Sequence, residues 1–258
     1  MKLKFEYAGV GYSTDTILEF TKAGLSPFWT EPLFHFYPDM DKAHFLQLDY
    51  TGRKKYLSGY FTVYESKSRD LLAEKLNSYN SYWQKYEAQI VSALEEIFSI
   101  DLTAVFNDLT CMTTFCPVSP RYLDRHTFDN FFMESEKGAL GTAIHEIIHF
   151  VWFHVWKNKF HDSPAEYETP HLKWIISEMV VEPVMRDPRL GSINPYYQHK
   201  ACVYPYFYTM NISGAPILDT LYSMISAMPI SDAMDAAYRY CADHEKDIRS
   251  HIERCENP

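Results

Sequence analysis

Two histidines and a glutamate lie within five consecutive residues near the middle of the chain, as His145-Glu146-Ile147-Ile148-His149. The residues around them are largely apolar, which predicts a buried helix. Positions four apart on a helix differ by only about 40° in direction, because each residue advances about 100°. His145 and His149 therefore project from one face, where two imidazoles can bind one Zn²⁺ and Glu146 can act on a bound water. Because such groups are unfavourable to bury without a partner, the apolar context also favours a metal ion.

A zinc site needs a further protein ligand, and the next helical stretch, 170–183, carries two carboxylates four residues apart. Glu178 and Glu182 stand in a segment that is otherwise rich in Trp, Ile, Met and Val, whereas a surface helix would spread its charges over a broad polar face. We therefore expect both side chains to point at a site. The metzincin arrangement is excluded, because Trp152 and Val155 stand where it requires Gly and His.

The start of this second helix is marked by Thr169 as the expected N-cap and Pro170 at the first helical position. His154 lies five residues after His149, so we expect it on a different face of the first helix. The loop 161–168 offers acidic residues as alternative third ligands: Asp162, Glu166 and Glu168.

This combination resembles the gluzincin metallopeptidases, the thermolysin-like branch of the zincins, over about residues 140–185. In that group H-E-x-x-H on one helix is followed by a Glu ligand on a second helix. The resemblance implies three zinc ligands: His145, His149 and Glu178. It implies Glu146 as the general base and Glu182 as the acid that orients a ligand histidine. The spacer 150–177 has 28 residues and is longer than in the thermolysin type.

Gluzincins also use a Tyr or His downstream of the Glu ligand to stabilise the oxyanion that forms beside the metal. The resemblance implies His199 or Tyr204 for this role. Tyr206 and Tyr208 lie in the same region, and the spacing does not choose between these residues or distinguish them from a Tyr-rich packing surface.

The expected activity is zinc-dependent hydrolysis of peptide bonds, with Zn²⁺ as the cofactor and a peptide or protein as the substrate. Two other classes remain open. One is a catalytically latent or inactive zincin-like binding or regulatory protein with an intact metal site. The other is a structural protein in which the motif is fortuitous.

The composition bounds the class of protein and its partners. The 258 residues are 47% hydrophobic and 16% aromatic, which is typical of a folded globular chain. A net charge of −10 argues against nucleic acid and against an anionic membrane surface as partners. The start of the chain has no signal-peptide pattern, and there is no run of about 18 apolar residues. Five cysteines without metal-ligand spacing predict free thiols, which favours the cytoplasm, although Cys111 and Cys116 are an alternative redox or ligand pair.

The expected fold class is α+β, with a zincin-like catalytic core, a small mixed or antiparallel sheet before the active helix, and a largely helical C-terminal part. We expect an N-terminal lobe over 1–99, which includes a long helix at 68–99, and a zincin-like catalytic region over 100–258. The two are compatible with one continuous domain. The oligomeric state is left open.

Other elements follow from local patterns. A short helix is expected over Asp15–Ala23, the active helix over Ser135–Lys159, and two terminal helices over 215–228 and 231–254, the second capped by Ser231 or Asp232. The β-branched and aromatic runs predict these strands: Leu3–Tyr7, Phe45–Tyr50, Tyr60–Tyr64, Leu102–Phe106, Thr110–Cys116 and Thr127–Met133. We expect one of the last two strands to be a sheet edge that holds the substrate by backbone pairing.

Overall fold

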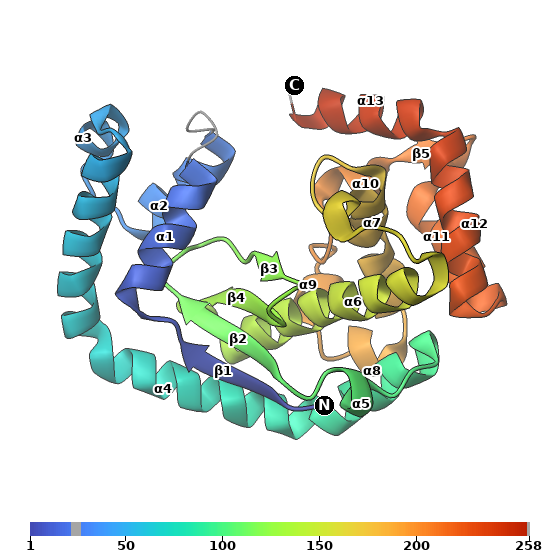
Figure 1. The fold of residues 1–258 in the computed structure, drawn as a ribbon, viewed down its shortest axis with the longest axis horizontal. Coiled ribbons are helices and arrows are strands. Elements are labelled where there is room, and N and C mark those ends of the chain that lie inside the picture. The colour runs from blue at the N-terminus through green and yellow to red at the C-terminus, as the bar shows by residue number, and fades with distance from the viewer. Residues whose placement is uncertain (22–26, 257–258) are drawn as a thin grey trace. The chain divides into compact units, whose positions relative to one another are not determined.

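The structure, a computed structural model, describes residues 1–21 and 27–256 and shows a helix-rich α+β protein with a small mixed sheet (Figure 1). The chain divides into two compact units. Unit 1 combines Met1–Lys85 with Phe106–Ala143, and unit 2 combines Tyr86–Val105 with Ile144–Pro258. Each unit takes two stretches of the chain, unlike the expected continuous lobes 1–99 and 100–258. The reason is long-range strand pairing, which brings the first residues beside a strand that follows the long helix.

The four-stranded sheet of unit 1 has the order β1-β2-β4-β3 (Figure 1). Its strands are β1 (Leu3–Tyr7), β2 (Leu109–Thr114), β3 (Arg121–Tyr122) and β4 (Thr127–Phe131). The β1–β2 and β2–β4 pairs are parallel, and β3 pairs antiparallel to β4. The strands predicted at positions 3–7, 110–116 and 127–133 are therefore confirmed. The expectation that β2 or β4 forms a sheet edge is wrong, because each has a neighbour on both sides.

Unit 1 also contains helices where strands were predicted. In the segment Phe45–Tyr50, the first three residues belong to α3 (Lys42–Gln47) and Tyr50 begins α4 (Tyr50–Phe98). Tyr60–Tyr64 lies within α4, which begins well before the predicted residue 68. Aromatic residues favour strands locally, yet here they recur at three- and four-residue steps and pack inward from a helix. The other helices of this unit are α1 (Gly9–Thr21) and α2 (Pro27–Phe36). The helix predicted over Asp15–Ala23 is confirmed up to Thr21, and its last two residues lie outside the described residues.

An aromatic cluster forms the core of unit 1. The ring of Phe115 stacks on Phe61 at 5.2 Å between centroids and meets Phe132 edge-on at 5.2 Å. The hydroxyl of Tyr37 donates a hydrogen bond of 2.7 Å to the carbonyl oxygen of Phe115. Buried aromatic rings contribute both large apolar area and directional contacts. Much of the high aromatic content of the chain therefore serves packing in this unit.

Unit 2 holds the C-terminal part of α6 (Glu136–Phe160) and all of α7 (Leu172–Met185). The predicted active helix is confirmed to within one residue at each end. The remaining elements are short or amphipathic: α5 (Leu102–Val105), η1 (Pro164–Glu166), α8 (Pro188–Gly191), α9 (Pro195–Gln198), α10 (Pro205–Thr209), β5 (Asn211–Ile212), β6 (Ala215–Pro216), α11 (Ile217–Ala227), α12 (Ile230–Asp243) and α13 (Glu245–Glu256). The α7 helix packs against α11 and α12.

Several boundaries in unit 2 differ from the expectations. Residues 102–105 of the strand predicted over 102–106 form the helix α5, and the side chain of Asp101 accepts a hydrogen bond from the amide of Ala104. The α7 helix begins after His171 rather than at 170, because the amide of His171 donates to the carbonyl oxygen of Glu168 in a preceding turn. Of the two predicted terminal helices, the one over 215–228 is confirmed as α11, which begins at Ile217.

The segment 231–254 forms two helices, α12 and α13, that are separated at His244. Pro229 is the N-cap of α12, so neither Ser231 nor Asp232 has the predicted capping role.

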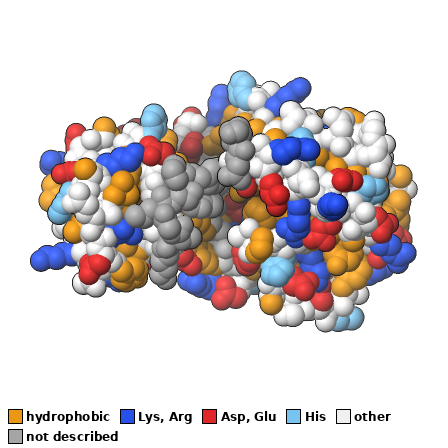
Figure 2. Space-filling model, turned by 90° about the horizontal axis from the view of Figure 1, so that it is seen from above, with side chains coloured by type: hydrophobic (Ala, Val, Ile, Leu, Met, Phe, Trp, Pro, Cys, Tyr) orange, Lys and Arg blue, Asp and Glu red, His pale blue; other side chains and the backbone are white. Residues whose placement is uncertain are grey.

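Charged side chains of both signs are interspersed on the face drawn in Figure 2. None of the helices that the structure describes is both long enough and apolar enough to cross a lipid bilayer.

Candidate metal centre

The α6 helix is apolar on nearly every side around its two histidines. Ile144, Ile147 and Ile148 are fully buried. A helix that is hydrophobic all round belongs in a core. His149 is also fully buried, at 0% exposure, whereas the side chain of His145 keeps 22%. The helix therefore carries one imidazole into the protein interior and leaves its neighbour partly accessible.

The α7 helix presents Glu178 to the same place. From Ile175 to Met185 every residue of this helix is buried, including Glu178 at 5% exposure. Burial of an ionised carboxylate is unfavourable unless it is paired with hydrogen bonds or with a cation. The apolar residues of α7 fix the helix in the core, and Glu178 then faces the imidazoles.

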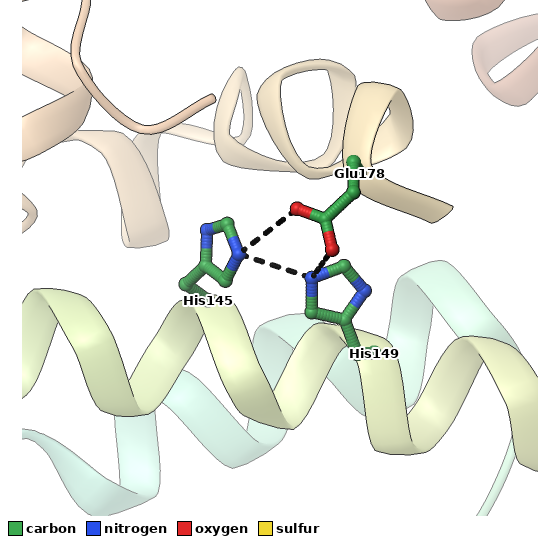
Figure 3. Close-up of side chains that lie close together, drawn as sticks. All are labelled: His145, His149 and Glu178. Atoms are coloured by element: carbon green, nitrogen blue, oxygen red, sulfur yellow. Dashed lines mark hydrogen bonds and ion pairs between the residues drawn. The ribbon is translucent and has the colours of Figure 1, made fainter. Parts of the chain in front are cut away.

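The three predicted ligands converge on one point (Figure 3). His145 and His149 project from α6 toward the carboxylate of Glu178 on α7. The two Nε2 atoms are 3.0 Å apart, and the Glu178 oxygens lie 3.7 Å from Nε2 of His145 and 3.5 Å from Nε2 of His149. Ligand atoms of a tetrahedral zinc ion stand about 3.3 to 3.6 Å from one another, given bond lengths of about 2.0 to 2.2 Å. The observed separations are close to this range.

The protonation of His145 is fixed by a main-chain contact. Its Nδ1 atom lies 3.0 Å from the carbonyl oxygen of Cys202. A carbonyl oxygen only accepts hydrogen bonds, so Nδ1 carries a proton and donates it. In the neutral imidazole Nε2 then holds a lone pair, and this is the atom that faces the other two groups. A metal-binding histidine characteristically donates its other ring N–H to such a partner.

The centre therefore brings electron-pair donors together. The carboxylate of Glu178 and Nε2 of neutral His145 are both acceptors, and Nε2 of His149 points at the same position. Such a set is stable only around a proton or a metal cation. Among the described residues, these three form the group of His, Cys, Asp or Glu side chains whose ligand atoms all lie within 4.8 Å of one another. The donor set of two imidazoles and one carboxylate fits zinc with an open fourth position.

Glu146 follows His145 directly on α6 and is 5% exposed. The α6 helix therefore holds a second buried carboxylate, one residue after the first candidate ligand in the sequence. It is the residue that H-E-x-x-H sites use as a general base.

Glu182 has a different partner from the predicted one. Both of its carboxylate oxygens accept hydrogen bonds from Nε of Arg186, at 3.1 and 3.0 Å, and Arg186 also contacts Asp219 at 2.8 Å. Glu182 was predicted to orient one of the ligand histidines, His145 or His149, and for His145 this contact is made by the carbonyl group of Cys202. The Glu182–Arg186 pair could have been predicted from the sequence, because an Arg four residues after a Glu on a helix commonly forms an ion pair with it. The contact of His145 with the carbonyl group of Cys202 could not, because every residue has a main-chain carbonyl.

The two residues predicted to stabilise an oxyanion are placed differently. His199 is exposed at the end of α9. Tyr204 precedes α10 and stacks on Tyr206 with ring centroids 5.2 Å apart. Burial raises the pKa of Tyr206, and the carboxylate of Glu178 is among the negative groups that raise it further. The negative charge of Glu178 therefore contributes to the raised pKa of Tyr206.

Three aromatic residues form a continuous half-buried surface beside Glu178. Trp174 lies four residues before Glu178, and hence on the same face of α7. Its ring contacts that of Tyr204 at 6.1 Å, and Tyr204 contacts Tyr206. The α13 helix holds this region, because Nε2 of His251 lies 3.1 Å from the carbonyl oxygen of Tyr206.

Among the described residues, the converging group contains none of the alternative ligands His154, Asp162, Glu166 and Glu168. His154 is bound to the side chain of Asn158 at 2.9 Å, so it serves another face of α6 as expected. Asp162 and Glu166 are paired with Lys173. None of the five cysteines, all within the described residues, is in a disulfide bond, which gives no support to a disulfide-forming pair at Cys111 and Cys116.

Comparisons with models of known protein families, with curated proteins and with solved structures give no match. The functional proposal therefore rests on the residues of the site.

Proposed function

We propose that this protein is a zinc-dependent peptidase, with Zn²⁺ held by His145, His149 and Glu178. One observation carries the proposal, namely the convergence of three electron-pair donors with the tautomer of His145 already fixed for binding through Nε2. A zinc ion there would lower the pKa of a water molecule towards about 7 and polarise a carbonyl group.

Two side chains of this protein would provide the general base and the hydrogen-bond donor for the oxyanion. The carboxylate of Glu146 would accept the proton of the attacking water and pass it to the leaving amine. The hydroxyl of Tyr206 would donate a hydrogen bond to the oxyanion that forms at the scissile carbonyl. A tyrosine hydroxyl is protonated, and therefore a donor, at neutral pH, and burial raises the pKa of Tyr206 further.

A peptide is the substrate that fits these surroundings best. The aromatic surface of Trp174, Tyr204 and Tyr206 suits a large apolar side chain next to the reacting amide. The net charge of −10 favours a neutral or basic peptide over an acidic one.

The test is hydrolysis of a mixed peptide pool by the zinc-loaded protein, with Glu146→Gln as the matched blank. The substitution keeps the size of the side chain and removes its basic function. We expect the variant to retain one zinc per chain and to lose activity by about 10²- to 10⁴-fold. Equal cleavage by both proteins would remove Glu146 from the role of base. Bound zinc without cleavage by either would favour a latent or regulatory zincin-like protein.

A further inference from the structure

A cluster of charged and aromatic residues joins the end of α6 to the start of α7. The carboxylate of Asp162 accepts three hydrogen bonds, from the indole of Trp156 at 2.9 Å, the hydroxyl of Tyr167 at 2.6 Å and the ammonium group of Lys173 at 2.5 Å. Lys173 also contacts Glu166 at 2.6 Å. We call Trp156, Asp162, Tyr167 and Lys173 the α6–α7 clamp.

The clamp is partly shielded from water. The side chain of Lys173 is 12% exposed and that of Asp162 is 22% exposed. The ring of Tyr167 stacks on Phe153 of α6, with centroids 4.3 Å apart and planes 18° from parallel. Ion pairs that are shielded and share several hydrogen bonds hold their geometry better than exposed pairs.

The position of the clamp relates it to the metal centre. Trp156 follows His149 by seven residues, which is two turns of α6. Lys173 precedes Glu178 by five residues on α7. The clamp therefore fixes, through one carboxylate, the two helices that supply the ligands. The two helices are also joined along the chain, through the segment 161–171.

We propose that Asp162 and Lys173 are positioning residues that preorganise the metal centre by holding Glu178 against the two histidines. This inference rests on the proposed function only in that the centre binds zinc, and it does not depend on peptide cleavage. Interactions that orient ligands without touching the metal typically change metal affinity by about 10- to 100-fold.

The test measures the zinc affinity of the full-length protein by competition with a chromogenic chelator, together with the visible spectrum of the Co²⁺-loaded protein. The variants are Asp162→Asn and Lys173→Met, with Lys173→Arg as the conservative replacement. The control is Asp232→Asn, which removes a more exposed ion pair between α12 and Lys159 of α6, with the atoms 3.4 Å apart. Circular dichroism selects a temperature at which every protein is folded.

We expect Asp162→Asn and Lys173→Met to weaken zinc binding by about 10- to 100-fold and to alter the Co²⁺ spectrum. Lys173→Arg should largely restore both, and Asp232→Asn should change neither. If Asp162→Asn does not fold, the two Lys173 variants decide the question. Unchanged affinity and spectrum in folded Lys173→Met would overturn the proposal, as would a parent protein that binds no zinc. A parent that binds zinc but cleaves no peptide would contradict the proposed peptidase alone.

Discussion

The Nδ1 atom of His145 lies 3.0 Å from the carbonyl oxygen of Cys202, which is 57 residues further along the chain. Because the carbonyl group only accepts, this contact fixes the proton of His145 on Nδ1 and directs the lone pair of Nε2 at His149 and Glu178. Cys202 contributes to the site through its main chain, while its thiol lies 3.3 Å from the hydroxyl of Tyr208. The segment before α10 is thereby coupled to the ligand set on α6 and α7.

Zinc should stabilise the folded protein. The ligand atoms are preassembled in the folded state and dispersed in the unfolded state, so binding shifts the equilibrium toward folding. At free zinc about 1,000 times the dissociation constant, the expected gain in free energy of unfolding is about 4 kcal/mol. Thermal unfolding with zinc and with excess chelator measures it. Glu178→Gln keeps the shape of the ligand and weakens its donor atom, so its unfolding should respond little to zinc. An equal zinc response in this variant would exclude Glu178 as a ligand.

Tyr206→Phe should lower kcat and leave zinc affinity unchanged. The substitution keeps the ring that packs on Tyr204 and Phe207 and removes only the hydroxyl. Loss of one oxyanion donor typically costs about 10²- to 10³-fold in kcat. The matched control is Tyr204→Phe, for which we expect a much smaller change. Steady-state kinetics of both variants on one peptide would decide, and the reverse order of effects would assign the role to Tyr204.

The stabilisation provided by the α6–α7 clamp should depend on pH in a defined direction. Burial alone raises the pKa of Asp162, but hydrogen bonds from Lys173, Tyr167 and Trp156 outweigh it, so the pKa falls below the ordinary 3.8. A carboxyl group with a lowered pKa contributes stability above its ordinary pKa and loses it as pH falls through the folded-state value. Burial lowers the pKa of Lys173, but its hydrogen bonds to Asp162 and Glu166 raise it above 10.5 overall. The contribution of Lys173 is accordingly fully present below pH 10.5 and is lost as pH rises through the folded-state pKa, which lies above 10.5.

Between about pH 5 and 9, Asp162→Asn should therefore reduce the free energy of unfolding by a constant amount of about 2 kcal/mol, typical of a hydrogen bond to a charged group. Below pH 3.8 the difference from the parent should shrink. Urea unfolding of both metal-free proteins across this range measures it. A difference that grows as pH falls would contradict the assignment.

The five thiols should differ sharply in reactivity. Burial raises the pKa of Cys202 to about 11 and those of Cys116 and Cys241 to about 12. Cys111 is also buried, whereas Cys255 is exposed near the end of α13. Because the thiolate is the reactive form, an aromatic disulfide reagent at pH 8 should label about one thiol per chain quickly. Cys255→Ser should abolish the fast phase, and the other four thiols should react after denaturation. Fast labelling of Cys255→Ser would contradict this picture.

Local sequence patterns were sufficient to predict α6 and α7, the two helices that carry the candidate metal ligands. The apolar run around His145 and His149 predicts the α6 helix almost to its ends, since a helix that is buried on all sides needs an uninterrupted apolar sequence. The four-residue spacing places the two imidazoles on one face without any tertiary information. The two carboxylates of α7 also follow from the sequence, because charges are exceptional in so apolar a segment. The strands predicted between residues 45 and 64 were wrong. The aromatic residues there have a high β propensity, but they pack inward from helices, and this packing outweighs the local preference.

The sequence by itself therefore determined which helices bear the ligands and which side chains they present, because helical periodicity is a local property. Only the tertiary structure decided which groups meet. It paired Glu182 with Arg186 rather than with a histidine, and it assigned the orientation of His145 to a main-chain carbonyl. It also brought β1 beside β2, across about a hundred residues. Such contacts depend on how segments that are distant in the sequence pack together. A main-chain carbonyl has the same chemistry in every residue, so the residue type does not predict a carbonyl contact.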